Sequence, residues 1–181
     1  MRLVLDACVL YPTVLREILA DLAAEGLFRP VWSQRILGEW RLAAERNGLS
    51  AGVEIALLAD RFPKACQPEA NDARAEGLDL PDPADRHVVE TALTSGADAI
   101  LTANLRDFPP RALAAVGLRA IHPDEFLHGL YLNAPDSVAR AVAMACRRAV
   151  QAGGAITRKD LLRRARLPRL AKALARFDDA E

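Results

Sequence analysis

The sequence predicts an α/β protein: a three-layer α/β/α domain with a central parallel sheet, followed by a helical C-terminal appendage. Short apolar runs, such as residues 3–5 and 97–102, alternate with longer segments of helical period. Strands separated by helices of about 10–15 residues are typical of a parallel sheet covered on both faces. From Pro123 onward only helical patterns continue. We therefore expect two parts, an α/β domain at residues 1–132 and a basic helical extension at residues 133–181.

The first third of the chain predicts one strand and three helices. Residues 3–5 are apolar and form the expected strand. Residues 12–25 predict a helix, because a proline stands in the first turn and Gly26 follows the end. Ser33 is a good N-cap for a second helix that ends near residue 47. A third helix is expected over residues 53–61.

The middle of the chain predicts a loop, a helix and two further strands. Residues 68–81 are polar and acidic, which favours a loop after a short strand at 65–67. The segment Asp82-Pro83-Ala84-Asp85 opens a helix that reaches residues 95–96. Buried strands are then expected at residues 97–102 and 118–121, on either side of a short helix.

The last part of the chain predicts helices alone. Residues 135–152 form one helix that ends at a pair of glycines. Thr157 and Asp160 form a capping box that opens the next helix, and Pro168 separates it from the last one.

The balanced charge of the chain, 24 basic against 24 acidic residues, hides a division. Residues 1–135 hold 13 Lys and Arg and 19 Asp and Glu, a net charge of −6. Residues 136–177 hold 11 basic and 2 acidic residues, a net charge of +9, and the last four residues contribute −3. A positive helical extension can attract the phosphate backbone of RNA. The net charge of zero therefore does not exclude a nucleic-acid partner.

The cysteines and the apolar runs limit the class of protein. Cys8, Cys66 and Cys146 are odd in number and widely spaced, and no C-x-x-C pair occurs. This pattern excludes a disulfide framework and a zinc ribbon and indicates a reducing compartment. No apolar run approaches the ~18 residues of a membrane span, and the N-terminus lacks the apolar core of a secretory signal. We therefore expect a cytoplasmic protein without a membrane partner.

Acidic residues recur at the ends of the predicted elements. Asp6 directly follows the first strand, and Asp82 and Asp85 stand three apart at a helix start. Asn104 and Asp107 follow the strand at 97–102 in the same way. Three of these residues have a local alternative to ligand binding. Asp6 could bind nearby backbone N–H groups, and helix capping explains Asp82 and Asp85. For any one of these three residues taken alone, the local role and the ligand-binding role both stay open.

If the strands at residues 3–5 and 97–102 are neighbours, these acids come together at the carboxyl edge of the sheet, where open α/β sheets bind ligands. Glu39 would lie close by, because it flanks the apolar stripe of the second helix. Carboxylates packed closely repel one another unless one takes up a proton or a cation binds. Oxygen ligands without His or Cys select Mg²⁺ or Mn²⁺ over zinc. A water on such a cation can attack a phosphodiester, so the residues suggest metal-dependent hydrolysis.

Four segments resemble the motifs of PIN-domain ribonucleases, the fold used by VapC-type toxins. They are LVLDACVLYP at residues 3–12 with Arg16 after it, ILGEW at residues 36–40, PDPADRHV at residues 81–88, and AILTANLRDF at residues 99–108. No single segment is diagnostic, but the order and spacing match over about residues 1–130.

The resemblance implies a Mg²⁺- or Mn²⁺-dependent endoribonuclease that acts as the toxin of a toxin–antitoxin pair. Asp6 and Asp85 are then metal ligands and Glu39 holds or activates the attacking water. Asp82 and Asp107 complete the expected metal set. Groups expected to position phosphate or water are Arg16, Arg86, Thr102 and Asn104, and His87 is expected to be packed or half-exposed rather than to act as a base. Asn104 stands where many relatives carry Asp, so the site could hold one metal firmly or two.

Two other functions remain open at this stage. The domain could be a catalytically weak PIN-like scaffold that binds RNA or protein, which the asparagine at position 104 leaves open. A haloacid-dehalogenase-type phosphatase also places an Asp after the first strand, but it needs a second Asp two residues on, where this chain has Cys8.

The basic extension has three interpretations. It could be a helical subdomain with a solvated arginine face, an arm that holds RNA, or a docking surface for an acidic antitoxin. The arginines expected to contact RNA are Arg147, Arg148, Arg163 and Arg164. The expected partners are thus an RNA substrate and a cognate antitoxin, with a homodimer as a further option.

Overall fold

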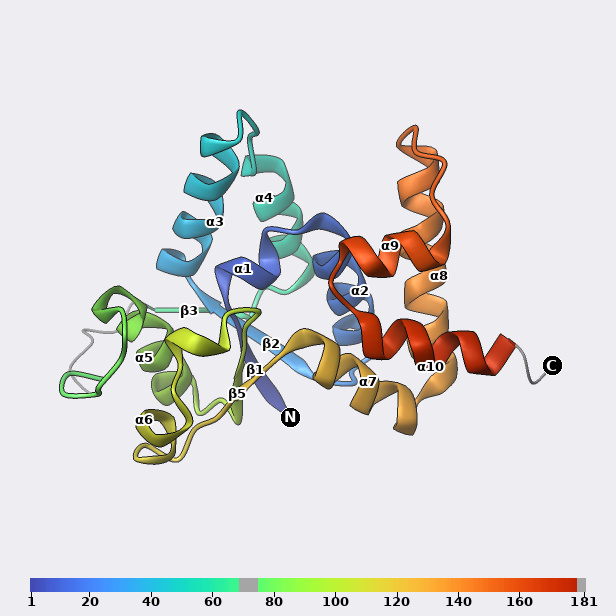
Figure 1. The fold of residues 1–181 in the computed structure, drawn as a ribbon. Helices are drawn as coiled ribbons and strands as arrows, with labels where there is room; N and C mark the ends of the chain where they lie inside the picture. Colours follow the sequence, from blue (N-terminus) through green and yellow to red (C-terminus); the bar gives the residue numbers. More distant parts are fainter. Residues whose placement is uncertain (69–74, 179–181) are drawn as a thin grey trace. The chain divides into compact units, whose positions relative to one another are not determined.

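The computed structural model describes residues 1–68 and 75–178, and the chain divides into two compact units (Figure 1). The α/β unit comprises Met1–Tyr11 and Phe28–His122. The helical unit comprises Pro12–Leu27 and the chain from Pro123 onward. The loop expected at residues 68–81 lies partly outside the described residues. The domain boundary expected at residues 132 and 133 stays a prediction.

A five-stranded parallel sheet forms the centre of the α/β unit, in the order β3-β2-β1-β4-β5. The strands are β1 (Arg2–Leu5), β2 (Arg29–Ser33), β3 (Cys66–Gln67), β4 (Ala99–Leu101) and β5 (Ala120–Ile121). Helices flank the sheet, so the predicted α/β fold class with a parallel sheet and C-terminal helices is confirmed. The strand β2 was not expected, because Pro30 and the polar ends of RPVWS hide a short run whose last three residues are buried.

The strand order reverses between β1 and β4. The chain adds β2 and β3 on one side of β1 and then crosses to place β4 and β5 on the other. Leu3 pairs with Ala99 and Leu5 with Leu101, so both strands end at the same level. Open α/β sheets bind ligands outside the carboxyl ends of the strands at such a reversal. The pairing of β1 with β4 confirms that the strands at residues 3–5 and 97–102 are neighbours.

Helices and short 3₁₀ turns carry the chain between the strands of the α/β unit. They are α1 (Ala7–Leu10), α3 (Gln34–Arg46), α4 (Gly52–Arg61), η1 (Pro83–Asp85), α5 (Arg86–Ser95), η2 (Leu105–Asp107) and α6 (Pro110–Ala114). The predicted N-cap of α3 is confirmed, because the Ser33 hydroxyl accepts a 3.3 Å hydrogen bond from the Ile36 N–H. Gly96 ends α5 with a φ of +61°, a conformation that glycine adopts without strain.

The core of the α/β unit fixes α3 and α5 against the sheet. The α5 helix packs on β1, β2 and β4, and its Val88, Val89 and Ala92 are fully buried. Trp32 of β2 is also fully buried and meets the Phe62 ring edge-on, at 6.2 Å between centroids. Burying a large apolar side chain contributes about 1.5–3 kcal/mol. The ends of both helices are thereby held at defined positions.

The helical unit consists of α2 (Thr13–Ala24), α7 (Pro123–Asn133), α8 (Pro135–Gln151), α9 (Arg158–Arg164) and α10 (Pro168–Asp178). The α2 helix packs along α8, and α10 packs on α7 and α9. The predicted cap of α9 is confirmed by a 3.1 Å bond from the Asp160 N–H to the Thr157 hydroxyl. The Asp124 carboxylate accepts from the N–H groups of Arg169 and Leu170 at the start of α10. None of the described helices is long and apolar enough to cross a membrane.

Candidate active site

Asp6 lies where β1 ends, beside the end of β4. Its backbone N–H donates to the Leu101 carbonyl at 3.1 Å. Its Oδ2 accepts from the Thr102 hydroxyl at 2.7 Å and from the Cys8 thiol at 3.0 Å. Asp6 occupies the N-cap position of α1, but its side chain makes no capping bond. The carboxylate is therefore held through Oδ2 by side chains, and no donor among the described residues faces Oδ1.

Thr102 and Cys8 form the support beneath Asp6. Thr102 is fully buried, and its hydroxyl also accepts from the Asn104 N–H at 3.0 Å. The Cys8 sulfur accepts from the Ala103 N–H at 3.2 Å. Burial, and then the charge of Asp6, raises the pKa of the Cys8 thiol to about 12, so the group stays a neutral S–H donor. Cys8 had not been predicted as a site residue, since a single cysteine after a strand carries no distinctive pattern.

The two aspartates at the start of α5 have different surroundings. Asp82 is exposed, and its Oδ1 accepts a 2.8 Å hydrogen bond from the Ala84 N–H as the N-cap of η1. Asp85 occupies the N-cap position of α5 but makes no capping bond with its side chain. Helix capping therefore accounts for Asp82 and does not account for Asp85.

The carboxyl of Asp85 is where the acidic charges converge. Partial burial, followed in order of effect by the charges of Asp107, Asp6, Asp82 and Glu39, raises its pKa to about 6. A like charge disfavours ionisation only when it lies nearby. The carboxylates of Asp6, Glu39, Asp85 and Asp107 are hereafter called the acidic cluster.

Asn104 and Asp107 act together at the end of β4. The Asn104 amide donates a hydrogen bond from Nδ2 to the Asp107 Oδ2 within η2. Asp107 is half-buried and exerts the largest electrostatic effect on Asp85, whereas Asn104 is exposed. The carboxylate expected at this end of the sheet therefore comes from Asp107, with Asn104 bonded to it.

Glu39 of α3 meets His87 of α5. The Glu39 Oε1 lies 2.7 Å from the His87 Nε2, across a sequence separation of 48 residues. The His87 side chain is only 4 % exposed, and that of Glu39 is 35 % exposed. Of the two surroundings expected for His87, the structure shows the packed one, but its contact with Glu39 was missed. Such a contact depends on how two helices pack, which no local pattern records.

The two arginines expected to position phosphate lie in different units. Arg86 is half-buried in the α/β unit, and within the described structure its Nε has no hydrogen-bond partner. Arg16 is buried in α2 of the helical unit, at 8 % exposure. The roles expected for both arginines stay predictions.

The donors of the acidic cluster suit a hard cation. In the described part of the chain, no three Asp, Glu, His or Cys side chains form a group that could hold a metal ion. Mg²⁺ does not need such a cage, because it usually keeps several waters and binds through one or two carboxylates. The available donors are carboxylate oxygens, and one oxygen of Asp6 faces no hydrogen-bond donor among the residues described. The residues therefore fit Mg²⁺ or Mn²⁺ by their chemistry.

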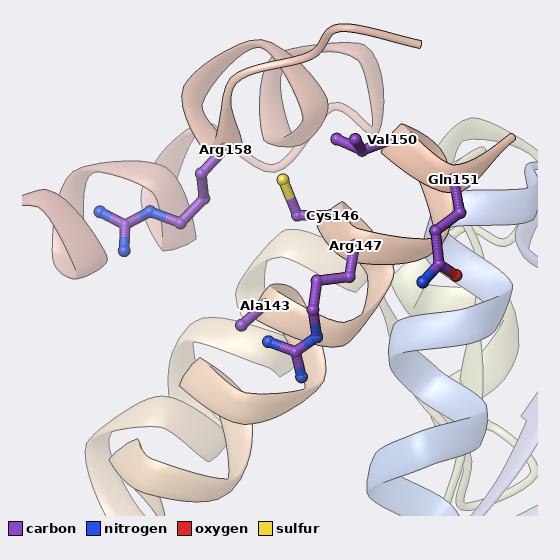
Figure 2. A pocket seen from close by; sticks show the side chains of 6 residues that line it. All are labelled: Ala143, Cys146, Arg147, Val150, Gln151 and Arg158. Atoms are coloured by element: carbon purple, nitrogen blue, oxygen red, sulfur yellow. The ribbon is translucent and has the colours of Figure 1, made fainter. Parts of the chain in front are cut away.

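The arginines predicted to contact RNA lie on α8 and α9 of the helical unit. Arg147 lines a hollow of about 460 Å³ with other α8 side chains and Arg158 of α9 (Figure 2). Arg148 bonds Asp21 at 2.9 and 3.3 Å and lies 3.6 Å from Glu17, so its guanidinium ties α8 to α2. Arg163 pairs with Asp160 at 3.0 Å but is 75 % exposed, and Arg164 is exposed.

Comparison with known proteins gives two matches. A family model described as PIN domain matches residues 2–106, which is more than half of the chain. The chain is also 46 % identical over 43 residues to the putative ribonuclease VapC50 of Mycobacterium tuberculosis (strain ATCC 25618 / H37Rv). This second match covers 24 % of the present chain and 25 % of that protein.

Proposed function

The chain belongs to the PIN-domain family, and from this premise we propose that it is a metal-dependent endoribonuclease. The observation that carries the proposal is the convergence of charge on Asp85 at the reversal of strand order. Structural acids are normally separated or paired with cations, because packed like charges cost free energy. A purely structural role does not explain why the acidic cluster brings like charges together. The partial match to a protein described as a putative ribonuclease supports RNA as the substrate.

The proposed roles follow from the hydrogen bonds of each carboxylate. Asp6 and Asp85 are the metal ligands, because neither is used for capping and Asp6 keeps one oxygen open. Asp107 assists them, and Asn104 holds one oxygen of Asp107 in place. Glu39 orients the attacking water through Oε2, since His87 occupies its Oε1. A bound Mg²⁺ or Mn²⁺ would lower the pKa of water and stabilise the displaced oxygen.

The test is cleavage of varied RNAs by the purified protein with Mg²⁺ or Mn²⁺. We expect Asp6→Asn and Asp85→Asn each to lower the cleavage rate by about 100-fold or more, because each removes a ligand charge. Glu45→Gln is the matched control, since Glu45 is exposed on α3, the helix that also carries Glu39. Circular dichroism would establish that all variants fold. Wild type that cleaves no RNA under either cation would refute the proposal.

A non-catalytic scaffold is the second candidate function. One observation favours it: the described side chains include no ready-made group of three metal-binding residues. Under this alternative the protein binds RNA with the same affinity with or without Mn²⁺, and Asp85→Asn leaves that affinity unchanged. The phosphatase alternative has less support, because Cys8 stands at the position of its acid/base and the thiol pKa is about 12.

We further propose that the nuclease is the toxin of a toxin–antitoxin pair, with an acidic antitoxin as partner. Of the four arginines predicted to contact RNA, Arg147, Arg163 and Arg164 are exposed and can reach a phosphate backbone. Arg148 is left out of this set, since its guanidinium is bonded to Asp21. Arg163→Glu combined with Arg164→Glu should weaken RNA binding and lower its salt dependence, since each lost phosphate contact reduces the salt slope by roughly one unit. If the double variant bound RNA with unchanged affinity and unchanged salt dependence, the proposal that these arginines hold RNA would be wrong.

A further inference from the structure

His87 is a buried histidine at a position where an apolar side chain would fit. It is 4 % exposed and lies among the fully buried Val88 and Val89 of α5. Its Nδ1 is buried and has no hydrogen-bond partner in the described structure. Burying an unpaired polar atom costs free energy, so packing alone does not explain a histidine here. Among the described residues, the one hydrogen-bond partner of the ring is Glu39.

The direction of that hydrogen bond follows from the chemistry of the two groups. A carboxylate oxygen only accepts, so the facing His87 Nε2 carries the proton and donates to the Glu39 Oε1. In the neutral ring with its proton on Nε2, the buried Nδ1 is an acceptor rather than an N–H group. The ring therefore presents a single donor at a fixed position, because α5 is packed against three strands of the sheet.

The geometry points to His87 as a positioning residue for Glu39, an inference that rests on the nuclease function proposed above. Glu39 is 35 % exposed, and a glutamate side chain has three rotatable bonds that would otherwise let its carboxylate move. The 2.7 Å bond to His87 fixes Oε1, so Oε2 is the oxygen of Glu39 that we propose orients the water. His87 also follows Asp85 by two residues, so one helix start carries a metal ligand and the support of Glu39.

This role predicts a separation of activity from stability. His87→Leu fills a similar volume and removes the unpaired Nδ1, so its unfolding midpoint in urea should equal or exceed that of wild type. Its kcat for RNA cleavage should fall by about 10- to 100-fold with KM nearly unchanged, as is usual when an outer hydrogen-bond partner is lost. His87→Gln should recover part of the loss, because its amide N–H can reach the Glu39 carboxylate. The matched control is His128→Leu, which changes a histidine of α7 in the helical unit and should leave kcat unchanged.

Two outcomes decide against the inference. Equal kcat for His87→Leu and wild type would overturn it, and so would a kcat that falls only in step with lost stability. Nuclear magnetic resonance gives a readout that is independent of activity and of the His87 variants. The Nε2–H proton should be protected from exchange in wild type and lose that protection in folded Glu39→Ala. A proton that stays protected in Glu39→Ala would also overturn the inference.

Failure of the proposed nuclease function can be told apart from failure of this inference. Wild type that cleaves no RNA would refute the nuclease function, and the exchange protection of the Nε2–H proton would then decide whether His87 holds Glu39. Protection that is present in wild type and lost in folded Glu39→Ala would support positioning. Equal protection in the two proteins would contradict it.

Discussion

The hydroxyl of Thr102 donates a 2.7 Å hydrogen bond to Oδ2 of Asp6 and thereby joins the ends of β4 and β1. The same hydroxyl accepts the N–H of Asn104, the first residue of the turn that leads to Asp107. One buried side chain thus sets the direction of a proposed metal ligand and the path of the chain toward another acid. The sheet alone would bring the strand ends together without fixing the orientation of either carboxylate.

Replacing Thr102 by valine tests this support, because valine keeps the shape and removes both hydrogen bonds. We expect the free energy of unfolding to fall by about 1–3 kcal/mol, the usual cost of leaving a buried polar partner unsatisfied. Urea denaturation would measure the change. Thr102→Ser keeps the hydroxyl and serves as the control. A valine variant as stable as the serine variant would show that the hydroxyl does not hold Asp6.

Changes at Asp82 distinguish a helix cap from a metal ligand. Asp82→Ala removes the bond to the Ala84 N–H and should lower the free energy of unfolding by about 1 kcal/mol. Asp82→Asn keeps a good capping side chain, so its stability should match that of wild type. Its RNA cleavage rate should stay within about threefold of wild type, since the proposed ligands do not include Asp82. A loss in Asp82→Asn as large as that in Asp85→Asn would make Asp82 a ligand instead.

Much of the fold could be predicted because its signals are local. The N-cap at Ser33, the cap at Thr157 and the helix opened by Pro83 depend on residues close together in sequence, and each is present. The position of Asp6 at the sheet edge was predictable as well, because an acid directly after a buried strand can only lie at the strand end. The short strand β2 was missed, since its polar ends break the apolar pattern.

The parts of the site that could not be predicted depend on packing between distant segments. The Glu39–His87 contact joins two helices, and the bond from the Ala103 N–H to the Cys8 sulfur joins two strand ends, so both require segments far apart in sequence to be in place. The helix-start pattern taken without the resemblance does not separate Asp82 from Asp85, because both fit it. Their difference appears only in the hydrogen bonds, where Asp82 caps η1 and Asp85 does not cap α5.

The raised pKa of Asp85 predicts how stability depends on pH without a divalent cation. The carboxyl has a pKa of about 6 in the folded protein and 3.8 as its ordinary value, so the folded state binds more protons between these values. The contribution of Asp85 to the free energy of unfolding therefore falls as pH rises from about 4 to 6 and is constant above that range. Asp85→Asn should lack this contribution. The thermal unfolding midpoint of the variant minus that of wild type should therefore rise between about pH 4 and 6. Thermal unfolding at several pH values, with EDTA present, measures the difference, and a constant difference would contradict the raised pKa.

Replacing Asn104 by aspartate tests whether this end of the acidic cluster faces a cation. The change removes the amide that donates to Asp107 and places a second negative charge beside that carboxylate. Without a divalent cation the variant should be less stable than wild type, because like charges close together repel. With Mn²⁺ the added carboxylate should raise the affinity, by roughly 3- to 10-fold, since hard cations favour charged oxygen ligands. Calorimetric titration with Mn²⁺ measures this, and Gln151→Glu in the helical unit adds the same charge as a control. Equal Mn²⁺ affinity in Asn104→Asp and in the control would show that no cation binds within reach of position 104.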